Sequence, residues 1–387
     1  MTQTDKQVSG TPSFRYPCTG LVQTEGFGAY LEEQLGPPRH NIRTFADELS
    51  THFDVPYLSL VNSGSSANLA ASFALAEKTG PGEALVAGFT FPTTMTSLLT
   101  AGYRVKIVDT TPGTFNLSPQ ALEQAISSET KVICVTHFLG FPAELAAIRA
   151  LCDKHNLLLL QDACESQHLL YEGKAVHHYG DLTTWSFYHP HHLSAFGGGG
   201  VISLDEDTHK LVESITHWGR ACTCHFDPSS CEAPEGMYHN FYYVRRGHNL
   251  EMSELNACFG RFQLRQWPTF EAKRKEHYNI LWEALRDCGS IEVYPALENN
   301  GSPFVFPITL KDKEVLEVSR SLAERGVETR NLMGGVIADQ PAFQDLPTDG
   351  LQHCRALAKT SIFVGIHQTL TTEDVHDVAK HLRAVLS

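Results

Sequence analysis

Short apolar runs alternate with helical patterns from about residue 40 to residue 205, and this alternation constrains the fold more than any other feature. The runs are Tyr57–Val61, Ala84–Ala87, Arg104–Val108, Lys131–Thr136, Leu157–Gln161, Thr184–Phe187 and Gly200–Leu204. Apolar runs of this length between helices are typical of buried parallel strands. The pattern predicts an α/β protein with a large, doubly wound, mostly parallel sheet. In such sheets the functional groups gather at the carboxyl ends of the strands.

The rest of the chain is organised around this sheet. Residues 1–20 are polar and lack periodicity, which predicts an N-terminal arm. We expect residues 21–265 to form the large domain, including a cysteine-rich loop at 218–240. A long helical stretch and a new set of strands then predict a smaller C-terminal α/β domain over residues 266–387.

Charge and hydropathy exclude several classes of partner. The chain has 30 Lys and Arg residues against 44 Asp and Glu residues, a formal net charge of −14, which disfavours binding to nucleic-acid phosphates. No apolar stretch follows a basic start, and no apolar run is long enough to cross a bilayer. We therefore expect a cytoplasmic protein that does not enter membranes. In that compartment its 10 cysteines indicate metal or redox chemistry rather than disulfides.

A turn of small residues follows the first apolar run and opens an Ala- and Leu-rich helix. Gly64 and Ser65 lie in this turn. The N–H groups and the positive dipole end of a helix bind phosphate readily. A serine that simply caps the helix accounts for the same residues, so the turn alone does not decide between the two interpretations.

Polar residues also follow two later runs. Asp162 comes directly after a buried run, where a carboxylate can pair with a protonated pyridine nitrogen or simply cap a helix. His189, His191 and His192 lie in a turn just before the glycines 197–200. This turn is either a solvated loop or a metal site, although adjacent histidines seldom close one tetrahedral site.

Taken in chain order, these motifs resemble the DegT-like family of sugar aminotransferases, which have the fold-type I architecture of pyridoxal-phosphate enzymes. The likeness spans nearly the whole chain. It also includes the segments Val108–Asp109, Phe115–Leu117, His137–Gly140, Tyr171–Lys174, Gly180–Asp181 and Gly247–Leu255. The resemblance implies a large cofactor-binding domain, a smaller C-terminal domain and a homodimer.

One departure from the family falls on the residue that anchors the cofactor. In the family a Ser-Phe-x-x-x-Lys segment supplies the lysine that forms the Schiff base. Here Ser186 and Phe187 fit, and the position of the lysine falls on His191, with no lysine between Lys174 and Lys210. Imidazole cannot form an imine, so the resemblance implies pyridoxamine 5′-phosphate (PMP) held without a covalent bond. Histidine can still move protons near neutral pH.

The resemblance also implies a set of cofactor-binding residues, namely Gly64, Ser65, Phe91, Asp162, Ser186, His191 and Asn249. Phe91 would stack on the ring, with plain core packing as the alternative, and Asn249 would reach the phosphate of the partner subunit's cofactor. Asp162 and His191 are the expected catalytic residues. The register of the motif favours His191 over its neighbours His189 and His192 as the base.

Replacement of the lysine by histidine is similar to the sugar 3-dehydratase branch of the family. One member, the GDP-4-keto-6-deoxymannose 3-dehydratase, uses no iron, whereas the CDP-4-keto-6-deoxyglucose 3-dehydrase carries a 2Fe–2S cluster on four cysteines. Four cysteines of this chain have nearly the spacing of the iron enzyme, with one residue fewer in the last gap: Cys164, Cys222, Cys224 and Cys231. Four thiolates suit zinc or iron–sulfur, and structural cysteines without a metal are the alternative.

We therefore expect a PMP-dependent, iron–sulfur-assisted dehydratase that removes the C3 hydroxyl next to the ketone of a sugar nucleotide or nucleoside. A flavin- or ferredoxin-type reductase would supply electrons. An iron-free PMP-dependent keto-sugar 3-dehydratase and a non-catalytic redox-sensing protein of the same fold remain as alternatives. Val336 and Asp339 stand where the iron enzyme has Asn and Arg. The loss of that cation weakens the case for a diphosphate-linked sugar.

Overall fold

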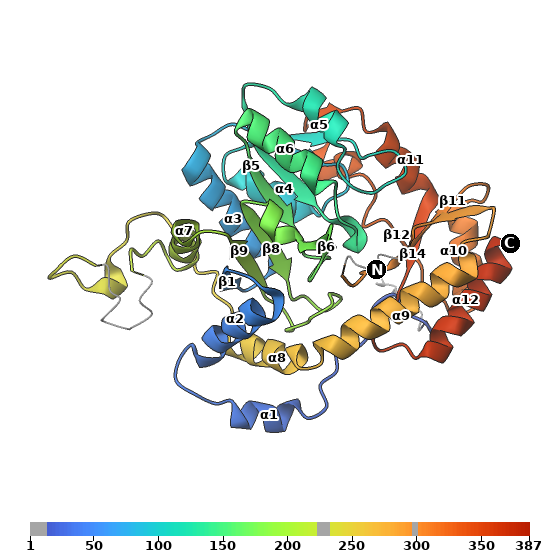
Figure 1. Cartoon of the computed structure of the whole chain (residues 1–387), viewed down its shortest axis with the longest axis horizontal. Helices are drawn as coiled ribbons and strands as arrows, with labels where there is room; N and C mark the ends of the chain where they lie inside the picture. Colours follow the sequence, from blue (N-terminus) through green and yellow to red (C-terminus); the bar gives the residue numbers. More distant parts are fainter. Residues whose placement is uncertain (1–13, 223–232, 296–300) are drawn as a thin grey trace, which may run out of the picture.

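The computed structural model describes residues 14–222, 233–295 and 301–387. Its large sheet has eight strands in the order β1-β9-β8-β5-β4-β2-β3-β13 (Figure 1). The strands are β1 (Tyr57–Val61), β2 (Glu83–Ala87), β3 (Arg104–Val108), β4 (Thr130–Thr136), β5 (Leu158–Asp162), β8 (Leu182–Ser186), β9 (Gly199–Ser203) and β13 (Thr348–Asp349). All seven apolar runs therefore form strands, within two residues of the predicted bounds.

The sheet is mostly parallel, but β9 runs antiparallel to both of its neighbours, β1 and β8. Our expectation of a parallel strand at this run was wrong. A parallel neighbour requires a crossover connection of a dozen or more residues, usually a helix. The connection from β8 to β9, residues 187–198, contains no helix that would carry the chain back across the sheet. The chain therefore reverses direction, and the predicted histidines lie in this reversal.

Helices cover both faces of the large sheet, as expected for a doubly wound fold. The helices of this part are α1 (Phe27–Glu33), α2 (His40–Phe53), α3 (Gly64–Thr79), α4 (Pro92–Thr100), α5 (Pro119–Ala125), α6 (Leu145–His155), α7 (Glu206–Thr216) and α8 (Glu254–Leu264). Along β2, Ala84 and Val86 share a buried cluster with α3 and α4. Leu85 and Ala87 share another cluster with α5 and α6. This alternation is the period of two that a strand buried on both faces requires.

A second, antiparallel sheet forms the core of the C-terminal part, on the right in Figure 1. Its strands lie in the order β10 (Ile291–Val293), β11 (Phe306–Leu310), β14 (Ser361–Val364) and β12 (Arg330–Asn331). The accompanying helices are α9 (Trp267–Leu285), α10 (Val315–Ala323), α11 (Gln352–Thr360) and α12 (Thr372–Leu386). A hairpin of β6 (Leu170–Tyr171) and β7 (Lys174–Ala175) completes the strands.

A strand of the C-terminal part connects the two parts of the molecule, in addition to the chain between α8 and α9. β13 comes from the C-terminal part, yet it pairs in parallel with β3 at the edge of the large sheet. Residues that follow or end β1, β2, β5 and β8 line one cavity together with residues of the C-terminal part, and the candidate site lies there. No helix in the described residues is both long and apolar enough to cross a bilayer.

Candidate active site

The start of α3 provides the predicted phosphate-binding turn. Ser63 caps the helix, because its side chain accepts a hydrogen bond of 3.0 Å from the backbone N–H of Ser66. A Cβ added to Gly64 would lie 2.6 Å from Cβ of Ser186 and 3.0 Å from Sγ of Cys164. Glycine is therefore required for this close approach of the helix to β8. Because Ser63 caps the helix, Gly64 and Ser65 do not serve as the cap. The capping and phosphate-binding interpretations of the turn are therefore compatible.

Asp162 is the last residue of β5, and three donors hold its carboxylate. Oδ2 accepts hydrogen bonds from Nδ2 of Asn68 at 2.9 Å and from Oγ1 of Thr94 at 2.6 Å. Oδ1 accepts the backbone N–H of Cys164 at 3.1 Å. The hydroxyl of Thr184 donates to Oδ1 of Asn68 at 2.6 Å, which fixes the orientation of that amide. The side chain of Asp162 is thus held in one position at the end of its strand.

His191 lies in the turn between β8 and β9, with its ring 5.6 Å from the ring of Phe304. Its Nδ1 is buried and has no hydrogen-bond partner. Burial lowers the pKa of His191 to about 4, with the positive charge of Arg274 acting in the same direction and Asp162 opposing it. The imidazole is therefore neutral at pH 7, which is the form that accepts a proton.

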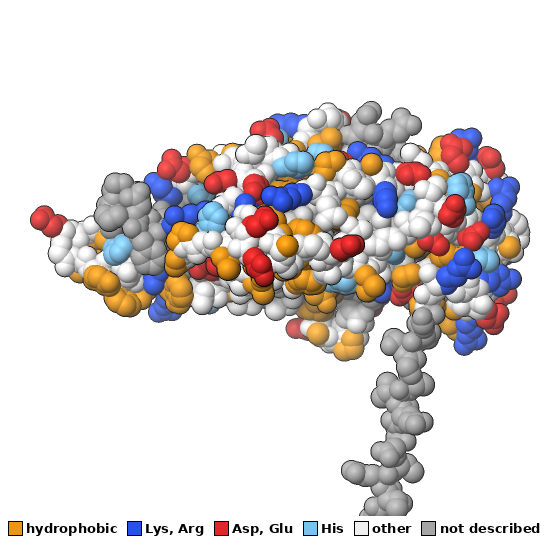
Figure 2. Space-filling view, turned by 90° about the horizontal axis from the view of Figure 1, so that it is seen from below, with side chains coloured by type: hydrophobic (Ala, Val, Ile, Leu, Met, Phe, Trp, Pro, Cys, Tyr) orange, Lys and Arg blue, Asp and Glu red, His pale blue; other side chains and the backbone are white. Residues whose placement is uncertain are grey.

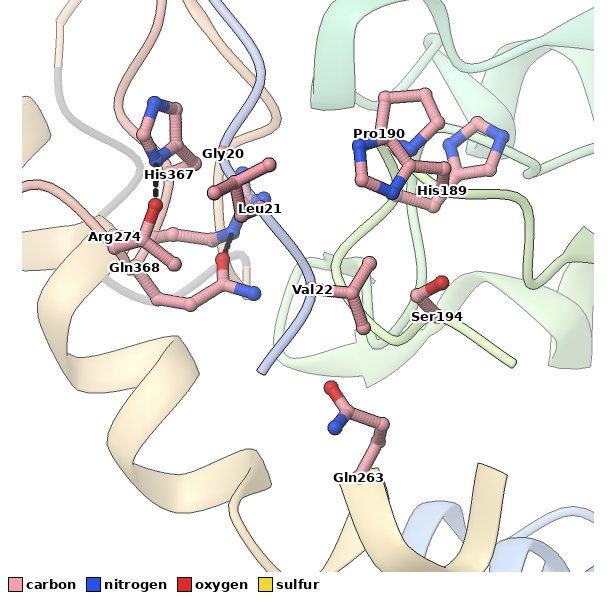
Figure 3. Close-up of a pocket in the computed structure, with 12 residues that line it drawn as sticks. Gly20, Leu21, Val22, His189, Pro190, Ser194, Gln263, Arg274, His367 and Gln368 are labelled. Carbon is pink, nitrogen blue, oxygen red and sulfur yellow. Dashed lines mark hydrogen bonds between the residues drawn. The ribbon is translucent and has the colours of Figure 1, made fainter. Parts of the chain in front are cut away.

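The two neighbouring histidines have different surroundings. Nε2 of His192 donates to the backbone carbonyls of Ser302 at 2.9 Å and Pro303 at 3.1 Å, so this side chain supports a loop. His189 lines a small adjacent cavity, where Figure 3 shows it opposite Arg274. Among the three predicted histidines, only His191 lines the large cavity described next.

A cavity of about 460 Å³ lies at the carboxyl ends of the strands, within the size range of small-molecule sites. It brings together most of the predicted site residues. Those that line it are Gly64, Ser65, Phe91, Asp162, Cys164, Ser186 and His191. None of the described residues that line it is a lysine.

Of the remaining predicted residues, Asn249 and Cys222 are described, and neither lines this cavity. Asn249 is exposed and pairs with His217 in an isolated bridge. Cys222 lies beyond α7, and Cys224 and Cys231 fall outside the described residues. Within the described part of the chain, no three Cys, His, Asp or Glu side chains converge as a metal site would require. The four-cysteine cluster therefore stays a prediction.

Glu165 was missed by the sequence analysis. It lines the large cavity, its Oε2 accepts the backbone N–H of Leu139 at 2.9 Å, and its Oε1 is buried without a partner. Burial raises the pKa of Glu165 to about 8. The carboxyl is therefore largely protonated at pH 7 and can donate a hydrogen bond. Its position three residues after Asp162 was the only available signal.

Arg274 was also missed. It extends from α9, its Nη1 donates to the carbonyl of Phe304 at 2.9 Å, and its Nε donates to Oε1 of Gln368 at 3.0 Å (Figure 3). Burial lowers the pKa of Arg274 to about 9, so it remains charged at pH 7. Among the described residues no carboxylate forms an ion pair with it. Nothing in the sequence around it predicts that a helix of the C-terminal part brings a buried cation to this site.

Curated relatives match most of the chain. The lipopolysaccharide biosynthesis protein RfbH of Salmonella typhimurium is 31% identical over 370 residues, which cover 89% of this chain and 84% of that protein. The dTDP-4-dehydro-2,6-dideoxy-D-glucose 3-dehydratase of Saccharopolyspora spinosa is 30% identical over 88% of this chain and 79% of its own length. The GDP-4-keto-6-deoxy-D-mannose 3-dehydratase of Escherichia coli is 26% identical over 94% of this chain and 96% of its own length.

A solved structure and a family model match the same chain over most of its length. The structure of the Escherichia coli GDP-4-keto-6-deoxy-D-mannose-3-dehydratase with bound hydrated PLP superimposes with a TM-score of 0.85 at 22% identity. It covers 97% of this chain and 100% of its own, which confirms the predicted fold-type I architecture. The model of the DegT/DnrJ/EryC1/StrS aminotransferase family matches residues 29–383. The chain therefore belongs to the DegT/DnrJ/EryC1/StrS aminotransferase family.

Proposed function

We propose that this chain is a PMP-dependent keto-sugar 3-dehydratase, which removes the hydroxyl next to the ketone of a sugar nucleotide or nucleoside. The observation that carries the proposal is a neutral, partly unpartnered imidazole, His191, in a cavity whose described lining contains no lysine. Without a lysine amine there, transamination by the usual route is disfavoured. Two of the relatives above are named as 3-dehydratases, which supports the same class of reaction.

The residues of the cavity fit a phosphorylated pyridine cofactor. The start of α3 suits the phosphate, since helix starts bind phosphate readily. Only a glycine at position 64 allows this helix start to lie so close to β8. The buried atoms Nδ1 of His191 and Oε1 of Glu165 have no partner within the protein, as expected where a bound group completes them. When bound, the cofactor supplies an electron-poor ring that stabilises negative charge on the carbon next to it.

Each wall of the cavity has a role in this proposal. Gly64, Ser65 and Ser186 bind the phosphate, and Phe91 covers one face of the ring. Asp162 holds the proton on the ring nitrogen, because three hydrogen bonds keep its carboxylate in place. These contacts orient the cofactor without the covalent bond that lysine provides in other members of the family.

His191 moves the proton that elimination requires. Its neutral imidazole would hold and move that proton beside the bound cofactor, which would supply the electron-poor ring that makes the proton acidic. The hydroxyl would leave the substrate as water after gaining a proton. A single histidine can serve both transfers. Arg274 favours the neutral imidazole, because a positive charge nearby disfavours a second one.

A homodimer supplies the remaining cofactor contact in this proposal, through Asn249 of the partner subunit. Exposed apolar side chains support it, because large exposed patches mark protein interfaces. They gather on the segment beyond α7, at the left end of Figure 2, and are Met237, Tyr238, Phe241, Tyr243 and Val244. Phe241 is 68% exposed, which is costly for an aromatic side chain that remains in water.

The iron–sulfur part of the proposal rests on the spacing of the cysteines. Elimination leaves an unsaturated substrate, so a 3-deoxy product requires two electrons from a flavin- or ferredoxin-type reductase. Cys164 lies in the cavity wall, where burial and the charge of Asp162 raise the pKa of its thiol. Among the described residues no three side chains converge as metal ligands, so the cluster remains a prediction from the cysteine spacing.

Replacement His191→Asn tests the base. We expect the variant to bind PMP as the unmodified chain does but to exchange the C4′ proton of PMP with solvent at least about a hundredfold more slowly. Proton NMR in D₂O measures the exchange, and equilibrium dialysis measures binding. His189→Asn is the matched control and should retain exchange. Exchange that survives His191→Asn would remove this residue from its role.

The pH dependence of the same exchange tests the buried environment of His191. A base with a pKa of about 4 stays neutral from about pH 7 down to about pH 5, where Glu165 also stays largely protonated, so the rate should remain level over that range. Below about pH 4 the imidazole becomes protonated, and the rate should fall tenfold per pH unit. A decline of the exchange rate centred near pH 6.5, the pKa of an ordinary histidine, would contradict the buried environment of His191.

Metal analysis separates the iron-dependent enzyme from its iron-free alternative. After anaerobic purification we expect about two iron and two sulfide ions per chain. Both should be lost in Cys164→Ser and in Cys222→Ser. Cys288→Ser is the control, since Cys288 lies in the C-terminal part and contacts Ser290, and it should retain the iron. An unmodified chain without iron that still dehydrates a keto sugar would establish the iron-free alternative.

A further inference from the structure

Arg274 is a buried cation whose charge no described carboxylate neutralises. It is only 2% exposed, yet it lines both the large cofactor cavity and the small adjacent cavity. Burying a charge is costly unless the charge is paired. We therefore expect this guanidinium to bind an anionic group that a ligand brings into the site.

Two of the three guanidinium nitrogens have partners that fix the side chain. Nη1 donates to the carbonyl of Phe304 at 2.9 Å. Nε donates to Oε1 of Gln368 at 3.0 Å (Figure 3). The third nitrogen, Nη2, has no hydrogen-bond partner among the described residues. Both partners are neutral oxygens, which a neutral donor would satisfy as well, so the positive charge and the open N–H groups are available to a ligand.

The guanidinium lies beside the proposed base. Arg274 and His191 line the same two cavities. Phe304 contacts both, because its carbonyl accepts the hydrogen bond from Arg274 and its ring lies 5.6 Å from the ring of His191. An oxygen that binds Nη2 in the large cavity would therefore lie close to the imidazole that moves protons.

The other charges of the large cavity are already assigned. The phosphate of the cofactor is proposed to bind at the start of α3, where Gly64 approaches β8. Arg330, the other arginine of the described lining, pairs with Glu328 at 2.8 Å. Arg274 is thus the arginine of this lining that has no carboxylate partner among the described residues. The negative charge that elimination itself creates is the one on the departing oxygen.

We infer that Arg274 is a further catalytic residue, whose Nη2 donates a hydrogen bond to the oxygen of the hydroxyl that leaves the substrate. The inference rests on the proposed function, because it requires an elimination. The C–O bond breaks with its electron pair on the oxygen, and the proton that His191 holds is transferred to this oxygen, so that water leaves. That proton comes from a C–H bond whose electron pair stays with carbon, so atoms and electrons balance. Removal of one donor to a developing oxyanion typically slows a reaction by about a hundredfold to a thousandfold.

Formate is the first probe, because it presents a charged oxygen to the open donor and requires no choice of sugar. Formate labelled with ¹³C is titrated into the PMP-loaded chain, and the NMR relaxation of its signal measures binding. We expect formate to bind and Arg274→Gln to weaken it by at least about tenfold. Arg274→Lys, which keeps the charge, should retain more of the affinity. Lys273→Gln is the matched control and should leave it unchanged, since Lys273 is the preceding residue of α9 and lines neither cavity.

Dehydration itself is the second measurement. The probes are GDP-4-keto-6-deoxy-D-mannose and dTDP-4-dehydro-2,6-dideoxy-D-glucose, the sugars in the names of two relatives. Arg274→Gln should slow dehydration by at least about a hundredfold. The C4′ exchange of PMP, in which no hydroxyl leaves, should persist in this variant. Arg274→Ala should recover part of the lost rate when guanidinium is added, which a misfolded chain would not do.

Formate that binds equally well to Arg274→Gln, or not at all to the unmodified chain, would overturn the inference. Dehydration at the normal rate in Arg274→Gln would do the same. A parallel loss of exchange and dehydration would also overturn it, because a purely structural residue behaves in that way. If formate behaves as expected but the unmodified chain shows no C4′ exchange, the proposed function fails and the anion site at Arg274 stands.

Discussion

The hydrogen bonds to Asp162 organise the candidate site. Asn68 extends from α3 and Thr94 from α4, so one carboxylate at the end of β5 connects both helices. The start of α3 is the proposed phosphate-binding turn, and Phe91 immediately precedes α4. The proposed positions of the phosphate, the ring nitrogen and the ring face are therefore coupled through one side chain. Because Thr184 orients Asn68, β8 is part of the same network.

Burial also sets the protonation states of three titratable groups of the cavity. Burial keeps His191 neutral and Glu165 protonated at pH 7, whereas Arg274 keeps its charge. A neutral base can accept a proton, and a protonated carboxyl can donate a hydrogen bond. The C-terminal part contributes Arg274 on one side and, on the other, the loop at 332–343, whose only charged residue, Asp339, pairs with Arg355.

The sequence was sufficient for the strands of the large sheet and for most of the cavity lining, because buried apolar runs and strand-end motifs are local signals. It did not predict the antiparallel direction of β9, which depends on the short connection from β8. Glu165 and Arg274 were missed, since their roles depend on burial that only the packed chain reveals. The predicted partners of Cys164 are distant in sequence, and Cys224 and Cys231 lie outside the described residues.

We propose that histidine has replaced the anchoring lysine, so that the protein holds its cofactor without a covalent bond. The most direct test is mass spectrometry of the intact chain after incubation with pyridoxal phosphate and reduction with borohydride. We expect no lysine of this site to be labelled and the mass of the chain to be unchanged, because no lysine lines the described cavity. A chain that gains the mass of one phosphopyridoxyl group, fixed to a lysine in this site, would contradict it.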